Sequence, residues 1–251
     1  MISAYYAGAS GLIASQDNMN VIGNNIANVN TSGYKPVTIS FNDLLYTEMY
    51  VNSTENPLSG NGVKSNITGV DARQGTPIPS SSELDLAIMG NGWFALESEG
   101  GTLYTRDGSF SVSISGTTAY LVNNDGNYVL DANGKRISTT VSQSATTGTT
   151  TTSVGIDSGA LIDQVGIYSF TNAGALTPAS SNCYKANDIS GKATVATKGQ
   201  NTILSGYLEQ SGVSIADEMV NLITAQRSYQ LSARVVQVSD EIEQTVNSLR
   251  G

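Results

Sequence analysis

Histidine is absent from this 251-residue sequence, and cysteine occurs once, as Cys183. Without histidine the chain cannot assemble a Ser-His-Asp or Cys-His catalytic arrangement or a His-ligated zinc site, and it lacks the usual general base at neutral pH. A single cysteine excludes an intrachain disulfide and a thiolate metal cage. We therefore expect no catalytic residue, no metal ligand and no cofactor, and we predict that the protein is not an enzyme.

Charged side chains are also scarce. They make up 13% of the chain, whereas about a quarter is typical of soluble domains. The net charge is −9 at pH 7, and no basic run occurs anywhere in the sequence. Since proteins neutralise nucleic-acid phosphates with clustered Lys and Arg, this balance excludes nucleic acid as a partner.

Long apolar runs are missing too, and none reaches the roughly 20 residues of a membrane-spanning helix. We therefore expect no membrane insertion. The residues Met1–Ala4 do not form the basic start of a signal peptide, and Gly8, Gly11 and Gln16 interrupt the apolar residues that follow. This pattern indicates a cytoplasmic protein or one exported by a route that leaves no such signal.

The amino-terminal segment has helical spacing. A seven-residue repeat of Tyr5, Leu12, Met19 and Ile26, extended by Ile22 and Val29, predicts a helix over residues 3–29, about 40 Å long. Asp17 is the only charged residue before Lys35, and three internal glycines each cost on the order of 1 kcal/mol. Such a helix is stable only when it is packed on several sides.

Two interpretations of this helix remain open. It is a core helix of a globular domain, or it is buried between subunits, with its glycines allowing close helix approach. In the second case its asparagines would bond to neighbouring subunits: Asn18, Asn20, Asn24, Asn25 and Asn28. The turn residues Thr31–Gly33 end the segment.

The carboxy-terminal segment predicts a second helix over residues 214–249, about 50 Å long. Its first stripe comprises Ile215, Met219, Leu222, Tyr229, Ala233 and Val236, and a rotated stripe comprises Val235, Val238, Ile242, Val246 and Leu249. Ser214 is a candidate N-cap, with Asp217 and Glu218 in the first turn. Arg227 and Arg234 share a face, which is either solvated or paired with acids on a neighbouring subunit.

Between the two helices the sequence is typical of β-structure. Short apolar runs flank turn signals at Asp107–Gly108, Asn124–Gly126 and Asn133–Gly134, which predicts hairpins at all three places. Residues 138–153 are almost wholly Ser and Thr, which predicts an exposed loop or linker. Two of the turns weakly resemble calcium loops, but they lack the acidic ladder and the terminal Glu.

These patterns predict an α+β protein in which the terminal helices pack together as a coiled-coil-like α domain beside a central β-rich domain. The expected parts are an amino-terminal helix in 1–35, an extended or irregular linker in 36–82, the β-rich domain in 83–206, and the carboxy-terminal helix in 207–251.

Four blocks of the sequence resemble the bacterial flagellar rod and hook (hook–basal body) family. They are Asn24–Lys35, Glu83–Phe94, Tyr104–Phe110, and the carboxy-terminal pair Gly206–Ser211 and Met219–Tyr229. They follow the order of the family, and the carboxy-terminal block is most similar to distal rod members. Residues 138–198 carry no such resemblance.

The resemblance implies a structural axial subunit of the flagellar basal body rod, which polymerises into a helical tube that transmits torque and conducts exported protein. It implies passage through the flagellar type III export apparatus without a cleaved signal peptide, into the rod that spans the periplasm. The implied partners are further copies in a helical filament, other rod and hook proteins, and bushing or ring proteins around the rod. A hook subunit and a proximal rod subunit are alternatives within the family.

From the helical pattern and the resemblance together we predict an assembly interface on both helices and the motif after the first. Its residues are Tyr5, Leu12, Met19, Ile22, Asn24, Asn25, Ile26, Asn28, Val29, Asn30, Gly33, Tyr34, Met219, Leu222, Gln226, Arg227, Tyr229, Val236, Ile242 and Leu249. Two other classes remain as alternatives: a secreted scaffold or adhesin, and a cell-wall glycan hydrolase that uses a carboxylate pair, although no such pair stands out.

Overall fold

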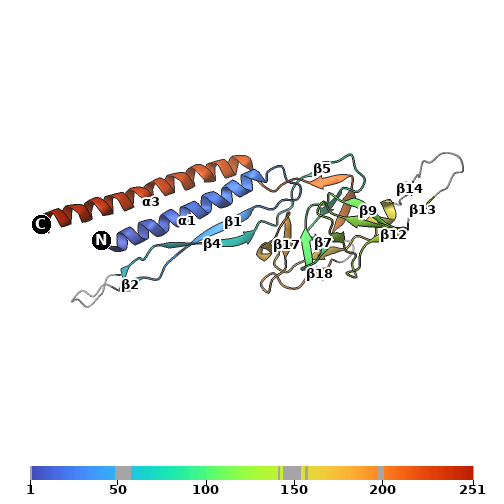
Figure 1. Ribbon diagram of the computed structural model, residues 1–251, viewed down its shortest axis with the longest axis horizontal. Coiled ribbons are helices and arrows are strands. Elements are labelled where there is room, and N and C mark those ends of the chain that lie inside the picture. Colours follow the sequence, from blue (N-terminus) through green and yellow to red (C-terminus); the bar gives the residue numbers. More distant parts are fainter. Residues whose placement is uncertain are drawn as a thin grey trace. The chain divides into compact units, whose positions relative to one another are not determined.

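The computed structural model describes residues 2–48, 58–140, 142–143, 154–155, 158–196 and 201–250. It confirms the α+β class, with a long helix near each end of the chain and β-structure between them (Figure 1). The chain divides into two compact units. Unit 1 comprises Met1–Ala27, Val37–Thr68 and Val213–Gly251, and unit 2 comprises Asn28–Pro36 and Gly69–Gly212.

Unit 1 is built on α1 (Ile2–Ala27) and α3 (Ile215–Arg250), which pack side by side (Figure 1). Both helices lie within two residues of the bounds that the sequence predicts. The start of α3 has the expected chemistry, since the Asp217 amide donates to the Ser214 hydroxyl over 3.5 Å and two acidic residues occupy the first turn. No Gly or Pro interrupts its 36 residues.

The segment expected to be an extended or irregular linker contains strands. In unit 1, β1 (Val37–Asp43) pairs with β4 (Val63–Val70), and β2 (Thr47–Glu48) pairs with β3 (Leu58–Ser59). The strand β1 also packs against α1. Of the expected extended or irregular segment, these parts are extended strands. Val37, Ile39 and Phe41 alternate with polar residues, which is the period-two pattern of a half-buried strand.

Unit 2 contains a ten-stranded sheet with the order β12-β10-β11-β7-β8-β17-β16, with β15 on β7, β18 on β15, and β9 on β10. Its strands are β7 (Trp93–Ser98), β8 (Gly101–Thr105), β9 (Ser111–Ser115), β10 (Thr118–Val122), β11 (Tyr128–Val129), β12 (Ser138–Thr140), β15 (Ile167–Ser169), β16 (Thr177–Pro178), β17 (Cys183–Lys185) and β18 (Thr194–Val195). The paired strands are antiparallel.

Smaller pairs complete unit 2: β5 (Pro77–Pro79) with β20 (Tyr207–Glu209), β6 (Leu86–Met89) with β19 (Thr202–Ser205), and β13 (Ser142–Gln143) with β14 (Val154–Gly155). A short helix, α2 (Ser158–Ile162), and a 3-10 turn, η1 (Ala173–Ala175), also belong to it. Strands β19 and β20 come from the end of unit 2 and pair with β6 and β5 near its start. The two ends of the unit are thereby joined by strand pairing.

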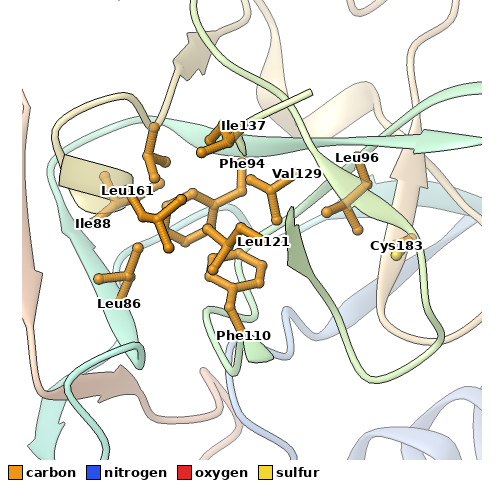
Figure 2. Packing of buried hydrophobic residues seen from close by; sticks show 11 residues of the cluster. Leu86, Ile88, Phe94, Leu96, Phe110, Leu121, Val129, Ile137, Leu161 and Cys183 are labelled. Carbon is orange, nitrogen blue, oxygen red and sulfur yellow. The ribbon is translucent and has the colours of Figure 1, made fainter. Parts of the chain in front are cut away.

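Two apolar clusters form the core of unit 2. The first is shown in Figure 2, where Phe94 and Phe110 lie among Leu86, Leu121 and Leu161. The rings of Phe94 and Phe110 meet edge to face with centroids 5.1 Å apart. The second cluster contains Trp93, which meets the ring of Tyr184 edge to face at 5.0 Å. Alternate residues of β7 thus supply both clusters, one on each face of the sheet.

The prediction of a hairpin at Asp107–Gly108 is wrong. The strands on either side, β8 and β9, do not pair with each other: β8 pairs with β7 and β17, and β9 pairs with β10. A Cβ atom at Gly108 would overlap the backbone of Leu86, whose amide donates to the Gly108 carbonyl over 3.0 Å. Gly108 is therefore required for a close backbone approach.

The other turn signals behave as the sequence predicts. Val122 pairs with Tyr128 across Asn124–Gly126, and Leu130 forms a bridge to Arg136 across Asn133–Gly134. The Ser/Thr-rich stretch is partly strand, since Ser138–Thr140 pairs with β10 and Ser142–Gln143 pairs with β14. Residues 141 and 144–153 of that expected loop lie outside the described residues.

Candidate assembly site

The helix pair of unit 1 has an antiparallel seam with small residues on the α1 side. A Cβ atom at Gly8 would lie 2.9 Å from Val236 Cγ2, and one at Gly11 would lie 3.0 Å from the Ser232 hydroxyl. One helical turn further along α1, the hydroxyls of Ser15 and Ser228 are 3.2 Å apart. The glycines that weaken α1 as an isolated helix therefore permit close approach to α3, while Gly23 faces open space.

Asn25 joins three elements of unit 1 through its side-chain amide. Its Nδ2 donates to the Val37 carbonyl and to the Glu218 carboxylate, each over 3.0 Å, and its Oδ1 accepts from the Val37 amide over 3.1 Å. Asn25 is buried, so these bonds replace water and fix the end of α1 to β1 and α3.

The outer surfaces of both helices carry large apolar side chains. Tyr6 and Ile13, seven residues apart on α1, are 63% and 65% exposed. On α3 the rotated stripe predicted from the sequence is exposed along its whole length, with side chains between 43% and 82% accessible: Val235, Val238, Ile242, Val246 and Leu249. Exposed apolar side chains that share one face of a helix are typical of interaction surfaces.

The predicted interface residues differ in their exposure. Nine are exposed: Tyr5, Asn24, Asn30, Met219, Gln226, Arg227, Tyr229, Ile242 and Leu249. Seven are half-buried: Leu12, Met19, Ile26, Asn28, Val29, Leu222 and Val236. Four are covered by their own chain: Ile22, Asn25, Gly33 and Tyr34. The last two belong to unit 2, where they lie beside a group of buried charges.

That group consists of Lys35, Arg106 and Glu209, which sequence reasoning missed. Lys35 Nζ lies 2.5 Å from Glu209 Oε1, and Arg106 Nη1 lies 3.1 Å from Glu209 Oε2. All three side chains are at most 2% exposed. One carboxylate thus holds two cations in the interior of unit 2.

Backbone groups complete this ion cluster. Lys35 Nζ also donates to the Arg73 carbonyl over 2.5 Å, and the Gly75 amide donates to Glu209 Oε1 over 2.6 Å. Arg106 Nη2 donates to the Gly90 carbonyl over 2.6 Å. The cluster therefore ties together segments from five places along the chain.

The ion cluster lies where the chain segments leading from α1 and toward α3 meet in unit 2. The Gly33 amide donates to the Glu209 carbonyl over 2.7 Å, and the Gly212 amide donates to the Tyr34 carbonyl over 2.9 Å. Gly33 has a φ of +66°, and a Cβ there would lie 2.5 Å from the backbone of Arg106. Only glycine fits this position without strain.

The electrostatics of the cluster depend on Glu209. Burial lowers the pKa of Lys35 and that of Arg106 below their ordinary values, and the Glu209 carboxylate opposes both shifts. Removing one partner of a buried ion pair costs about 3–5 kcal/mol, because it leaves an uncompensated charge. Here the loss of Glu209 would leave two uncompensated cations, Lys35 and Arg106.

A sequence signal for the cluster exists in hindsight. Lys35, Arg106 and Glu209 each lie inside one of the blocks that carry the family resemblance, in a chain where only 13% of residues are charged. No local pattern indicates that they meet, because Lys35 lies 71 residues before Arg106, and Arg106 lies 103 residues before Glu209.

Cys183 is 2% exposed, and burial raises the pKa of its thiol to about 11, so it is a poor nucleophile. Among the described residues, no group of three or more Cys, Asp or Glu side chains could hold a metal ion. In the same part of the chain, no helix is long and apolar enough to cross a membrane.

Three family models match the chain in the order of its elements. The model described as "Flagella basal body rod protein" matches residues 6–35, "Flagellar hook protein FlgE/F/G D1 domain" matches residues 87–162, and "Flagellar basal body rod FlgEFG protein C-terminal" matches residues 204–249. The first and third cover most of α1 and α3, and the second covers much of the sheet.

Curated relatives match over the whole length. The flagellar basal-body rod protein FlgG of Bacillus subtilis is 36% identical over 100% of both chains, and FlgG of Caulobacter vibrioides is 34% identical over 99% of this chain and 100% of its own. The rod protein FlgF of Mesorhizobium japonicum is 27% identical over 99% of each chain. The chain therefore belongs to the bacterial flagellar rod and hook protein family, with FlgG rod proteins among its full-length relatives.

Proposed function

We propose that the protein is a structural axial subunit of the flagellar basal body rod. It polymerises head-to-tail into a helical tube that transmits torque and conducts exported protein. Heterologous contacts whose rotation does not close produce such a filament. The protein is a structural subunit and not an enzyme, and its place is the basal body.

The observation that carries this proposal is the surface of unit 1. Its two helices leave side chains such as Ile13, Leu231 and Leu249 at least 65% exposed. Burying an exposed Leu or Ile side chain stabilises by about 1.5–3 kcal/mol. Neighbouring subunits in a tube would bury this surface.

The proposed interface comprises the exposed and half-buried predicted residues on α1 and α3. The four covered residues act inside the subunit: Asn25 bonds to β1 and α3, Ile22 is buried, and Gly33 and Tyr34 border the ion cluster. Arg227 and Arg234 are exposed, and neither forms an ion pair within the described residues. We assign them to contacts with acids on neighbouring subunits.

The partners follow from this role. They are further copies of the chain, other rod and hook proteins, and bushing or ring proteins around the rod. Delivery is through the flagellar type III export apparatus, without a cleaved signal peptide. An α1 helix that is marginal until neighbours bury it suits passage through a narrow channel as an unfolded chain.

A hook subunit or a proximal rod subunit is the second candidate, since a hook-protein model and an FlgF relative also match. Electron microscopy of basal bodies from a strain lacking this protein separates a rod subunit from a hook subunit. Loss or truncation of the rod is the expected result, whereas a complete rod without a hook would indicate a hook subunit. An intact rod and hook would contradict both and favour a secreted scaffold, an adhesin or a glycan hydrolase.

A further inference from the structure

The last turns of α3 extend beyond α1. Along the antiparallel seam Gly8 lies opposite Val236, and Asn25 lies opposite Glu218. Continued to Ile2, this register ends near Glu241. Residues 242–249 therefore continue for about two turns with no part of α1 beside them.

This end of α3, which we term the apolar tip (residues 242–249), has one apolar side. Ile242, Val246 and Leu249 follow one another at steps of four and three residues, so they share a face. They are 44%, 43% and 82% exposed. The last four carbonyl groups of any α-helix also lack partners within the helix, so the tip presents acceptors as well as apolar surface.

At the opposite end of the helix pair, unit 1 has a groove of about 250 Å³. Its lining includes five apolar residues, from α1 and β1: Val21, Ile22, Val37, Ile39 and Phe41. Phe41 is 48% exposed. An apolar cavity of about 150 Å³ holds a benzene molecule, so this groove has room for one or two aliphatic side chains.

The groove also supplies hydrogen-bond donors. The side-chain amides of Asn18 and Asn221 line it and make no hydrogen bond within the described residues. Each amide offers two N–H donors. A helix carboxy-terminus, with its unpaired carbonyls, offers acceptors for such donors, while the Glu218 carboxylate in the same lining accepts from Asn25 over 3.0 Å.

We propose that the apolar tip of one subunit inserts into this groove on a second copy of the chain. The proposal rests on the proposed function and names one subunit contact within it. Tip and groove lie at opposite ends of unit 1, so each subunit uses its tip on one neighbour and its groove on another. This contact is heterologous, which allows it to propagate into a filament.

Cysteine cross-linking in assembled basal bodies tests the contact. A chain with Ile39→Cys and Val246→Cys carries one cysteine in the groove and one on the tip, and the pair Phe41→Cys with Leu249→Cys provides a second geometry. The native Cys183 is buried and its thiol has a raised pKa, so the unsubstituted chain is the matched control without cross-links.

Mild oxidation of isolated basal bodies is expected to give a ladder of covalent multimers from at least one of the two double variants. Each variant with only one introduced cysteine should stay monomeric. Dimers from the Val246→Cys single variant would indicate tip-to-tip pairing and overturn the proposal. Incorporation into basal bodies without a cross-link from either double variant would also overturn it, whereas absence of the wild-type chain from basal bodies would refute the proposed function itself.

A second measurement separates assembly from folding. Leu249→Asp places a charge on the tip, and Ile189→Asp, at a position 75% exposed in unit 2, is the control. We expect loss of incorporation into basal bodies for the first variant and none for the second, with unchanged circular dichroism of both monomers. Normal incorporation of Leu249→Asp would contradict insertion of the tip into an apolar groove.

Discussion

Unit 2 buries two apolar clusters, whereas unit 1 leaves most of the large apolar side chains of α3 exposed. Unit 2 has two closed apolar clusters, with Phe94 and Leu96 fully buried, and a buried ion cluster in which Glu209 holds two cations. In unit 1 the seam between α1 and α3 buries Ala14, Ile22 and Ala225, while most of the larger apolar residues of α3 stay exposed. The difference separates a domain that buries its apolar side chains by its own contacts from one that leaves many of them exposed.

The same contrast appears in the charges. The ion pairs of the described residues all belong to unit 2, and those of Lys35 and Arg106 are fully buried. Unit 1 relies on small residues and neutral amides, such as Gly11, Ser15 and Asn25. The contacts inside unit 1 are thus made without ion pairs among the described residues.

The largest expected effect comes from breaking the ion cluster. Glu209→Gln keeps the shape of the side chain but leaves Lys35 and Arg106 without a counter-charge, so we expect unit 2 to lose about 3–5 kcal/mol of unfolding free energy. Urea denaturation followed by the fluorescence of buried Trp93 measures it.

Glu97→Gln is the control for this substitution. Glu97 bonds to Arg136 over 2.6 Å, but both side chains are exposed to solvent. Exposed ion pairs contribute little to the free energy of unfolding, so the midpoint of urea denaturation should hardly change. Equal losses for the two variants would mean that burial does not set the strength of the cluster.

Hydrogen exchange compares the two units directly. In a dilute monomer the amides of α1 should exchange at least about tenfold faster than those of β7, because local stability follows buried contacts. A factor of ten corresponds to about 1.4 kcal/mol. In isolated basal bodies the difference should narrow as neighbours cover the helices. Equal protection of α1 and β7 in the monomer would show that unit 1 is complete by itself.

The sequence predicts the helices of unit 1 well, because the 3.6-residue periodicity of α1 and α3 is local. It predicts the turn at Asn124–Gly126 for the same reason, since the strands on either side pair. It fails at Asp107–Gly108, where β8 pairs with β7 and with β17, which lies far along the chain, and not with β9. A turn signal carries no information about such distant pairing.

The candidate site also has one part that the sequence predicts, the interface residues, and one part that it does not, the ion cluster. Exposure of residues such as Met219 and Leu249 agrees with the predicted interface, although contact with a neighbour remains a prediction. The ion cluster could not be predicted, because Lys35, Arg106 and Glu209 meet only through tertiary structure. Their common feature in the sequence is that each is a charge in a charge-poor chain, which does not identify a partner.

Two separate Gly→Ala substitutions in α1 test how closely the two helices pack at the seam. Gly23→Ala meets open space and should stabilise the helix pair by up to about 1 kcal/mol, since Gly is a poor helix former. Gly8→Ala gains the same propensity but places a Cβ 2.9 Å from Val236, so it should be neutral or destabilising. Thermal unfolding followed at 222 nm measures both. A gain at Gly8 equal to that at Gly23 would contradict close packing of the seam.

The smallest effect expected is a pH dependence of unit 2 at the alkaline end. Burial raises the pKa of the Cys183 thiol from 9.0 to about 11, so the unfolded chain releases this proton at lower pH than the folded chain does. Above pH 9 the folded state therefore binds more protons, and its stability falls as the pH rises toward 11. Cys183→Ala removes this contribution, and its melting temperature should fall less steeply over pH 9–11 than that of the unsubstituted chain. Burial also raises the pKa of Tyr184, so a residual slope should persist in the variant, and identical slopes in the two proteins would mean that the thiol ionises equally in the folded and unfolded states.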